Sequence, residues 1–266
     1  RHSHLYDSAP ILQVKDVVKD YQLTKKLFQP QRYFRAVDSV SFDLYKGESL
    51  GLVGESGCGK STLGNMILGL LPVTSGSVIF ENQNLALISK TQMRSLRKKI
   101  QIIFQDPFAS LNPRIKIGTA IQEPMKWHGI GSSDSDRKRR VEELLERVGL
   151  AASYYDRYPH EFSGGQRQRI GIARAVGLKP EMIVCDESVS ALDISVQAQV
   201  LNLLNEFKED MGFSYVFISH DLGVVNYFCD RVIVMNQGKI EEQNEADELY
   251  KNPQKEYTKK LIDAIP

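Results

Sequence analysis

The stretch "GESGCGKST", Gly54–Thr62, decides the fold. It matches the pattern G-x-x-x-x-G-K-[ST], in which the glycines let the backbone curl so that successive N–H groups face phosphate oxygens. The apolar run Ser49–Val53 before it predicts a short buried strand, and Lys60–Leu71 after it predicts a helix that Pro72 terminates. This context indicates a phosphate-binding loop, with Lys60 reaching the terminal phosphates and the Ser61 hydroxyl available to Mg²⁺.

An acidic pair stands at the end of another apolar strand, "MIVCDE", where α/β sheets place their ligands. Asp186 is predicted to hold Mg²⁺ through water, and Glu187 to accept a proton from an attacking water. Together with the glycine loop, the pair indicates a nucleoside triphosphatase. GTPases and small-molecule kinases share the first motif. However, the chain has no Asn-Lys-x-Asp guanine-reading segment, and "NQGK" at 236–239 is interpreted as a plain turn.

The composition is that of an ordinary globular protein: 266 residues, 42% hydrophobic and 25% charged. Because 34 Lys and Arg nearly balance 33 Asp and Glu, the net charge does not favour nucleic acid as a partner. Three cysteines without metal-ligand spacing predict a reduced, cytoplasmic compartment. The apolar run at 65–73 is too short to cross a membrane, and we expect no signal peptide.

The hydrophobic pattern predicts an α/β core interrupted by a mostly helical insert. Strands dominate 8–105 and 178–242, and helical periodicity dominates 106–177, followed by a helical tail at 243–266. The whole chain is expected to be one domain. We predict a loop at 25–35, "KKLFQPQRYFR", and a solvated basic face at 137–140, "RKRR". The insert is predicted to bury one helix face, formed by Val141, Leu144, Leu145 and Val148.

A second phosphate cradle is predicted in "EFSGGQRQRIGIARA", Glu161–Ala175, where Ser163 and two glycines open a helix. With this motif the chain resembles the ATP-binding subunit of an ABC transporter, from about Ile11 to Pro266. In that family "SGGQ" is the signature motif. The resemblance implies an α/β fold: a P-loop NTPase (RecA-like) core with a small antiparallel β subdomain and a helical insert subdomain. The resemblance implies that two subunits pair head to tail and that each signature helix caps the ATP held by the other subunit's glycine loop.

The same resemblance implies the remaining site. Gln105 corresponds to the glutamine that contacts Mg²⁺, "SALD" at 190–193 to the loop that crosses the dimer interface, and His220 to the histidine that orients the attacking water. Tyr21 is assigned to adenine stacking, with Tyr33 and Phe34 as competitors. The catalytic residues are then Glu187, His220 and Lys60. Metal binding is assigned to Ser61, Gln105 and Asp186. ATP is assigned to Tyr21, Gly54, Glu55, Ser56, Gly57, Cys58, Gly59, Lys60, Ser61, Thr62, Gln105, Ser163, Gly164, Gly165, Gln166 and Asp193.

Three further segments, at 104–114, 188–204 and 252–266, resemble the oligopeptide, dipeptide and nickel import branch. This implies a second ATPase subunit (a related chain or a copy of this one), two transmembrane permeases and an external binding protein. The chain is then expected at the cytoplasmic face of the membrane, with Phe108–Ile117 as the edge that meets a permease. Peptide is the leading cargo, with nickel or a glutathione-like solute as alternatives. Ser188 stands where the family usually has Pro.

Two other readings are disfavoured. A non-transport ABC ATPase of the DNA-repair kind would carry long coiled coils between the glycine loop and the signature. Only about a hundred residues separate Lys60 from Ser163, without sustained heptads. A translation-type protein would carry two cassettes. A catalytically silent cassette would have lost the key Lys, Glu or His, and all three are present.

Overall fold

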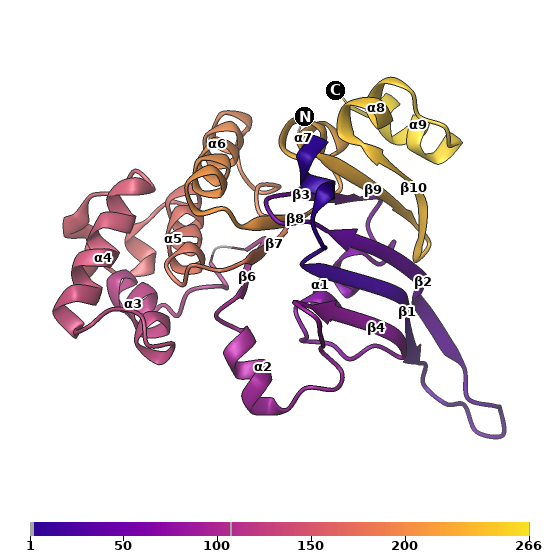
Figure 1. The fold of residues 1–266 in the computed structure, drawn as a ribbon, viewed down its shortest axis with the longest axis horizontal. Helices are drawn as coiled ribbons and strands as arrows, with labels where there is room; N and C mark the ends of the chain where they lie inside the picture. The colour runs from indigo at the N-terminus through magenta and orange to yellow at the C-terminus, as the bar shows by residue number, and fades with distance from the viewer. Residues whose placement is uncertain (1–2, 107, 266) are drawn as a thin grey trace. The chain divides into compact units, whose positions relative to one another are not determined.

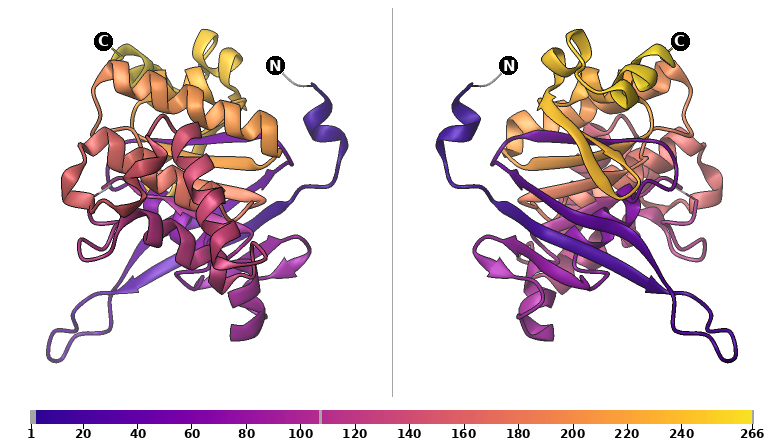
Figure 2. Two further views of the ribbon diagram at one scale, coloured as in Figure 1. Left: turned by 90° about the vertical axis from the view of Figure 1, so that its left-hand side faces the viewer. Right: turned by 90° about the vertical axis from the view of Figure 1, so that its right-hand side faces the viewer.

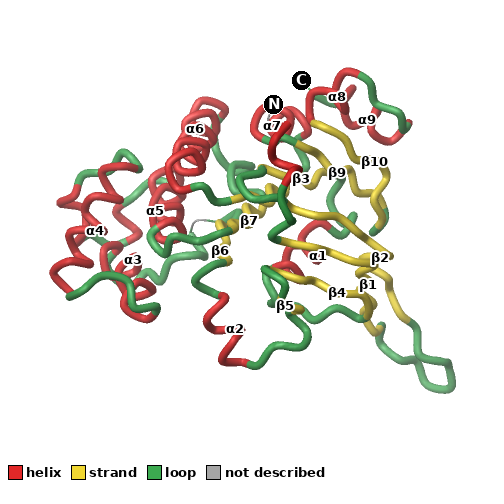
Figure 3. The backbone as a smooth tube through the Cα atoms, in the orientation of Figure 1, coloured by secondary structure: helices red, strands yellow, loops and turns green. Residues whose placement is uncertain are grey.

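The computed structural model describes residues 3–106 and 108–265 of the chain (Figures 1 and 3). Pro107 and Pro266, which belong to the predicted insert and tail, lie outside these residues. The chain divides into two compact units, one of Arg1–Met93 with Ser214–Pro266 and one of Arg94–Phe213. The division lies within the short helix α2 (Lys90–Leu96).

The first unit contains an antiparallel sheet of four strands in the order β2-β1-β4-β5. Its strands are β1 (Leu12–Gln22), β2 (Tyr33–Leu44), β4 (Ser75–Phe80) and β5 (Gln83–Asn84). The loop predicted at 25–35 is shorter than expected, because Tyr33 and Phe34 pair with Gln22 and Tyr21. Aromatic residues favour extended, paired backbone, and here they lengthen the hairpin. Its connecting segment extends beyond the end of the sheet (Figure 2).

A second group of strands in this unit carries the glycine loop. It runs in the order β10-β9-β3-β8, with β3 parallel to both β8 and β9. The strands are β3 (Ser49–Val53), β8 (Ser214–Ser219), β9 (Arg231–Asn236) and β10 (Lys239–Glu245). β3 and β8 are buried along their whole length, as expected of parallel strands covered on both faces. The turn predicted at 236–239 joins β9 to β10 and is confirmed.

Helices complete the first unit: α1 (Lys60–Ile67), α7 (Leu222–Phe228), α8 (Ala246–Lys251) and α9 (Glu256–Asp263), with a 3-10 turn η1 (Ser3–Asp7) near its start. Helix α1 ends four residues earlier than predicted. Gly69 has φ +66°, the left-handed conformation that commonly closes a helix. The N–H groups of Leu70 and Leu71 both donate to the carbonyl of Asn65, so the chain turns away before Pro72 is reached.

The second unit pairs β6 (Ile100–Ile103) in parallel with β7 (Met182–Asp186) and is otherwise helical. Its helices are α3 (Ile117–Trp127), α4 (Asp134–Arg147), α5 (Gly164–Val176) and α6 (Ile194–Met211), with 3-10 turns η2 (Ala152–Asp156) and η3 (Pro159–Glu161). The helix face predicted from Val141, Leu144, Leu145 and Val148 is buried, which confirms the period.

The basic run at 137–140 forms a solvated face only in part. Arg139 and Arg140 both bind the carboxylate of Asp136, at 2.6 and 3.0 Å. The Arg137 side chain is only 13% exposed and donates to the carbonyl of Ile130 at 2.8 Å. The backbone N–H of Ser132, followed by the two arginines, holds the pKa of Asp136 well below its usual range. The run therefore ties the start of α4 together.

All three cysteines, Cys58, Cys185 and Cys229, are buried, and none forms a disulfide. Burial raises the pKa of the Cys185 thiol far above its usual value, which keeps it protonated. Over 3–106 and 108–265, no helix combines the length and the apolar character needed to cross a bilayer.

A buried ion pair joins β9 to the turn before β3. Glu48 is fully buried, and its carboxylate accepts from Nε of Arg231 at 2.8 Å and from the N–H of Tyr45 at 3.0 Å. Glu48→Gln removes the charge and leaves Arg231 buried without its counter-ion. We expect this to lower the free energy of unfolding by about 3 kcal/mol, measured by urea denaturation. Arg35→Gln, which breaks an exposed pair with Asp20, serves as the control and should cost much less. Equal losses in the two variants would contradict the expectation.

Candidate functional site

The glycine loop lies between β3 and α1, and its two motif glycines are required by close packing. A Cβ on Gly54 would lie 2.4 Å from the carbonyl oxygen of Met235 in β9. A Cβ on Gly59, which has φ +99°, would lie 2.5 Å from the carbonyl oxygen of Ala36 in β2. Both distances are shorter than any real side chain allows, and the φ of Gly59 favours glycine as well. The loop is therefore fixed against two strands.

Lys60 turns back over the loop that precedes it. Its ammonium donates to the carbonyls of Gly54 at 2.5 Å and Glu55 at 3.1 Å, and the residue is only 6% exposed. Ser61 follows in the first turn of α1 and is exposed. A curled loop of N–H donors, a lysine held over it and a hydroxyl at the helix start are the donor set that a polyphosphate with Mg²⁺ requires. The residues present thus fit ATP and Mg²⁺.

His220 lies at the same sheet edge as the glycine loop. β3 and β8 run parallel with Val53 opposite Ser219, so that Gly54 and His220 are the next residues on neighbouring strands. Asp221 accepts from the N–H groups of Gly223 and Val224 at 2.9 and 3.2 Å and caps α7. This cap fixes the backbone immediately after the exposed His220.

Tyr21 is placed near the loop by register. It pairs with Phe34, two residues before Ala36, whose carbonyl packs against Gly59. Tyr21 is 38% exposed, whereas Tyr33 and Phe34 are 57% and 53% exposed. All three aromatics are thus accessible, and the assignment of adenine stacking to Tyr21 stays a prediction.

Tyr257, in α9, is a contact of the glycine loop that the sequence argument missed. Its hydroxyl accepts a hydrogen bond from the backbone N–H of Glu55 at 3.0 Å, across 202 residues of sequence. Burial raises the pKa of its phenol above the usual value, so the hydroxyl stays protonated. The aromatic residue in the tail segment 252–266 was the available signal, but nothing in the sequence indicated its long-range partner.

Replacing Tyr257 by Phe removes this hydrogen bond and keeps the ring. We expect the Kd for MgATP to rise about three- to tenfold, because the loop loses one bond that holds its shape before ATP binds. Titration with a fluorescent ATP analogue measures it. Tyr250→Phe, in the same tail and 39% exposed, is the matched control and should leave Kd unchanged. Tighter binding by Tyr257→Phe would show instead that the hydroxyl competes with phosphate for the Glu55 N–H.

In the second unit, Gln105 and the acidic pair also share one strand edge. β6 and β7 run parallel with Ile103 opposite Cys185, so Gln105 and Glu187 each follow two residues later. The Gln105 amide donates to Oγ of Ser190 at 3.4 Å, and that hydroxyl donates to the Glu187 carbonyl at 2.9 Å. Glu187 has φ +51°, a strained conformation for a glutamate, which turns the backbone sharply directly after the strand.

Gln168, on α5, ties these loops to the signature helix. It is 2% exposed, and its amide donates to the carbonyl of Ser188 at 2.6 Å and to that of Phe104 at 3.5 Å. A single buried side chain thus joins the helix to the loop after β7 and to the end of β6. Sequence reasoning passed over Gln168, although a glutamine on an otherwise apolar helix face was a usable signal.

The signature segment forms a capped helix start. Ser163 Oγ accepts from the N–H of Gln166 at 3.2 Å, and the Gln166 side chain accepts from the N–H of Ser163 at 3.0 Å, which is a capping box. Gly164 and Gly165 occupy the first turn, where backbone N–H groups have no partner within the helix. The guanidinium of Arg167 lies 3.7 Å from the centre of the Phe108 ring. The segment predicted to bind an anion is therefore a helix N-terminus closed by a capping box, and anion binding there stays a prediction.

Asp193 begins α6 as its N-cap residue without a side-chain capping bond, and it is exposed. The next residue, Ile194, is 85% exposed, which is unusual for a large apolar side chain. Gly165 approaches this helix, since a Cβ there would lie 3.2 Å from Cγ1 of Val196. These features agree with a surface that another subunit covers, and the crossing of a dimer interface stays a prediction.

The predicted site residues fall into two groups. The glycine loop, Tyr21 and His220 lie in the first unit. The second unit contains Gln105, Ser163, Gly164, Gly165, Gln166, Asp186, Glu187 and Asp193. In the first unit, the parallel strands β3 and β8 place Gly54 beside His220. In the second, Gln105 is linked to Glu187 through Ser190. The assembly of ATP sites from these groups, each closed by the signature segment of an opposite subunit, stays a prediction.

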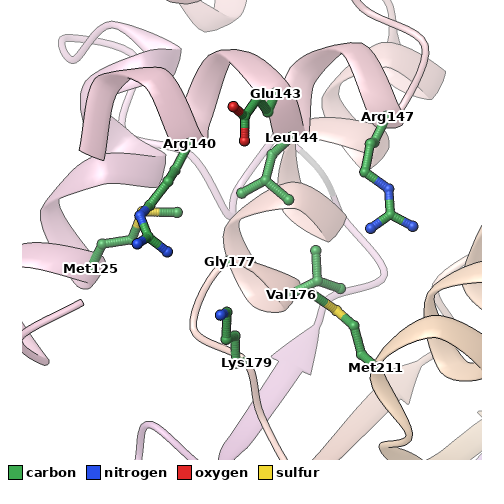
Figure 4. Close-up of a pocket in the computed structure, with 9 residues that line it drawn as sticks. All are labelled: Met125, Arg140, Glu143, Leu144, Arg147, Val176, Gly177, Lys179 and Met211. Atoms are coloured by element: carbon green, nitrogen blue, oxygen red, sulfur yellow. The ribbon is translucent and has the colours of Figure 1, made fainter. Parts of the chain in front are cut away.

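A separate hollow of about 230 Å³ lies in the second unit, away from these residues (Figure 4). Arg140 and Arg147 line it, but each already binds a carboxylate, Asp136 at 3.0 Å and Asp210 at 2.5 Å respectively. Lys179 also lines the hollow, and we assign no ligand to it. The apolar lining consists of Met125, Leu144, Val176 and Met211.

Comparisons with known proteins agree with this geometry. Residues 37–190 match the family model described as ABC transporter. The chain is 52% identical over 258 residues to the oligopeptide transport ATP-binding protein AppF of Bacillus subtilis, covering 96% of this chain and 78% of that protein. It is 49% identical over 261 residues to the glutathione import ATP-binding protein GsiA of Salmonella typhi, covering 98% of this chain and 42% of that longer protein.

The fold is similar to that of the dimeric ATP-binding cassette MJ0796 in a post-hydrolysis state bound to ADP and Pi. The TM-score is 0.79 at 28% identity, covering 88% of this chain and 98% of that one. The P-loop NTPase fold expected from the sequence is thereby confirmed. The chain combines a glycine loop of the phosphate-binding pattern with an acidic pair at the end of β7 and a capped signature helix. It is also similar to these relatives. The chain therefore belongs to the ABC transporter family, as one of its ATP-hydrolysing cassettes.

Proposed function

We propose that this cassette powers the import of peptides. The observation that carries the proposal is the similarity to an oligopeptide transport protein, which extends over 96% of the chain. In this role the cassette acts at the cytoplasmic face of the membrane with two permease subunits and an external binding protein. It pairs head to tail with a related ATPase subunit or with a copy of itself.

The proposed chemistry uses the residues described above. Lys60 and the loop N–H groups neutralise and orient the phosphates, and the signature N–H groups of the opposite subunit close the site over the γ-phosphate. Ser61, Gln105 and Asp186 would hold Mg²⁺, Asp186 through water, and the ion would supply further charge neutralisation at the phosphate oxygens. Glu187 accepts the proton of the attacking water, which His220 helps to orient. Closure of the dimer precedes hydrolysis, and loss of the γ-phosphate opens it.

A permease segment is proposed to dock on the second unit beside Phe108–Ile117. Phe108 is 57% exposed, and Trp127 on α3 is 68% exposed. The guanidinium of Arg94 lies 4.2 Å from the Trp127 ring centre, which holds this large apolar side chain at the surface. Exposed aromatics of this kind support an interface for a partner of the transporter.

The first experiment is the mass of purified Glu187→Gln in solution, measured by light scattering with and without MgATP. A shift from monomer to dimer on addition of ATP would show that this chain alone completes both composite sites. ATP binding without dimerisation would indicate an obligatory related partner. A dimer that forms equally without ATP would contradict nucleotide-driven closure.

Glutathione import is the second candidate, favoured by the 49% identity to GsiA over almost the whole chain. Reconstitution of the cassette with its permeases and binding protein separates the two. Stimulation of ATP hydrolysis by an oligopeptide but not by glutathione supports peptide import, and the reverse supports the alternative.

A further inference from the structure

The connection between β1 and β2, residues 23–32, forms an ordered tip, which we call the β1–β2 tip. The N–H of Leu23 donates to the carbonyl of Arg32 at 2.9 Å and closes its base. The N–H of Gln29 donates to the carbonyl of Lys26 at 3.1 Å and forms a turn around Leu27 and Phe28. The segment is thus a hairpin end with a defined apex (Figure 2).

The apex presents two large apolar side chains. Leu27 is 83% exposed and Phe28 is 97% exposed. Phe28 has φ +67° at the third position of the turn, where glycine or asparagine is strongly preferred. Phe28 therefore occupies the apex although its ring is exposed to water and its φ is unfavourable for a residue with a side chain. Neither the exposure of Phe28 nor its φ favours the fold of the chain.

The tip is also basic. Residues 21–37 contain four cations and no Asp or Glu, although the chain as a whole is nearly neutral. Arg35 is matched by Asp20 at 2.8 Å. The other three cations, Lys25, Lys26 and Arg32, form no ion pair within 3–106 and 108–265. Lys26 and Arg32 line a hollow of about 250 Å³ beside the turn.

We propose that the β1–β2 tip binds a membrane surface containing anionic lipids. Leu27 and Phe28 enter the boundary between headgroups and acyl chains, while Lys25, Lys26 and Arg32 bind the lipid phosphates. The order of side chains along the hairpin, apolar at the apex and basic behind it, matches the order of layers met on approaching a bilayer. The proposal does not rest on peptide import.

The test is flotation of the full chain with vesicles of phosphatidylcholine alone or with about 30% phosphatidylglycerol. We expect binding to the anionic vesicles that weakens as salt is raised, because exposed charges are screened. The triple variant Lys25→Gln/Lys26→Gln/Arg32→Gln should lower the partition coefficient on the order of 100-fold, since each basic residue contributes about fivefold. Leu27→Ser/Phe28→Ser should lower it by more than tenfold.

Two matched control variants test whether membrane binding is specific to the β1–β2 tip or arises from any exposed apolar or basic side chain. Leu87→Ser removes an apolar side chain that is 82% exposed elsewhere in the same unit. Lys251→Gln/Lys260→Gln removes two exposed cations from the tail. Both should bind as the unaltered chain does. MgATP affinity, which no variant should change, verifies that each is folded.

Three results would overturn the proposal: no binding at millimolar lipid, equal binding to neutral vesicles, or equal loss in the control variants. Normal lipid binding by the tip variants combined with failure to assemble with the other transporter subunits would also overturn it, and would assign the tip to a protein partner.

Discussion

Glu187→Gln is expected to bind MgATP as tightly as the unaltered chain and to lose ATP turnover by on the order of 1,000-fold or more. The substitution keeps the size of the side chain and removes the group that accepts the proton. Glu187 directly follows β7, in a left-handed conformation, and its carbonyl is held by Ser190. The loop therefore has support that does not depend on the carboxylate, and its shape should survive the change.

The adjacent carboxylate supplies the control. Asp186→Asn is expected to weaken binding of MgATP, because Asp186 is assigned to the metal rather than to the proton. Steady-state phosphate release and equilibrium ATP binding, measured on both variants over a range of Mg²⁺ concentrations, separate the two roles. If Glu187→Gln retained its turnover, Glu187 would not be the base, and another group would have to accept the proton.

Ser163→Asp is expected to reduce ATP turnover by more than 100-fold while leaving the helix intact. Aspartate caps a helix as well as serine does, so the start of α5 should fold normally. Its negative charge, however, would lie in a cradle meant for the γ-phosphate of the opposite subunit and would repel it.

Ser163→Asn is the matched control, because asparagine caps equally well and has nearly the same size without the charge. Its turnover should fall only a few-fold. Phosphate release is measured for both variants. ATP binding is measured at a concentration where the chain is monomeric, and neither variant should change it. Equal activity of the two variants would mean that the signature helix does not meet phosphate.

The local motifs could be predicted from the sequence because each is short and follows from one physical requirement. The apolar pattern predicts the strand before Gly54 and the helix after Gly59. Glycine is required at these two positions because a Cβ would lie within 2.5 Å of a neighbouring backbone oxygen. The buried face of α4 followed from its 3.6-residue period. These features depend on neighbours in sequence.

What the sequence did not reveal depends on partners far along the chain. Tyr257 contacts Glu55 only because the tail, which belongs to the first unit, packs against the glycine loop. Gln168 stands out in the sequence as a glutamine on an apolar helix face, but its partners, the carbonyls of Phe104 and Ser188, are known only once the ends of β6 and β7 lie beside it. Helix α1 ends before Pro72 for a local reason, because a glycine in the left-handed conformation, here Gly69, closes a helix just as effectively as a proline.

The burial of every cysteine has a practical consequence. Maleimide reagents attack thiolates that they can reach, and Cys58, Cys185 and Cys229 are only 5%, 0% and 0% exposed. The natural chain should accordingly be almost inert to such reagents while folded. One cysteine introduced at an exposed position, for example at Leu87, should carry a fluorophore or spin label alone. Distances within a working transporter then become measurable without first removing any natural thiol.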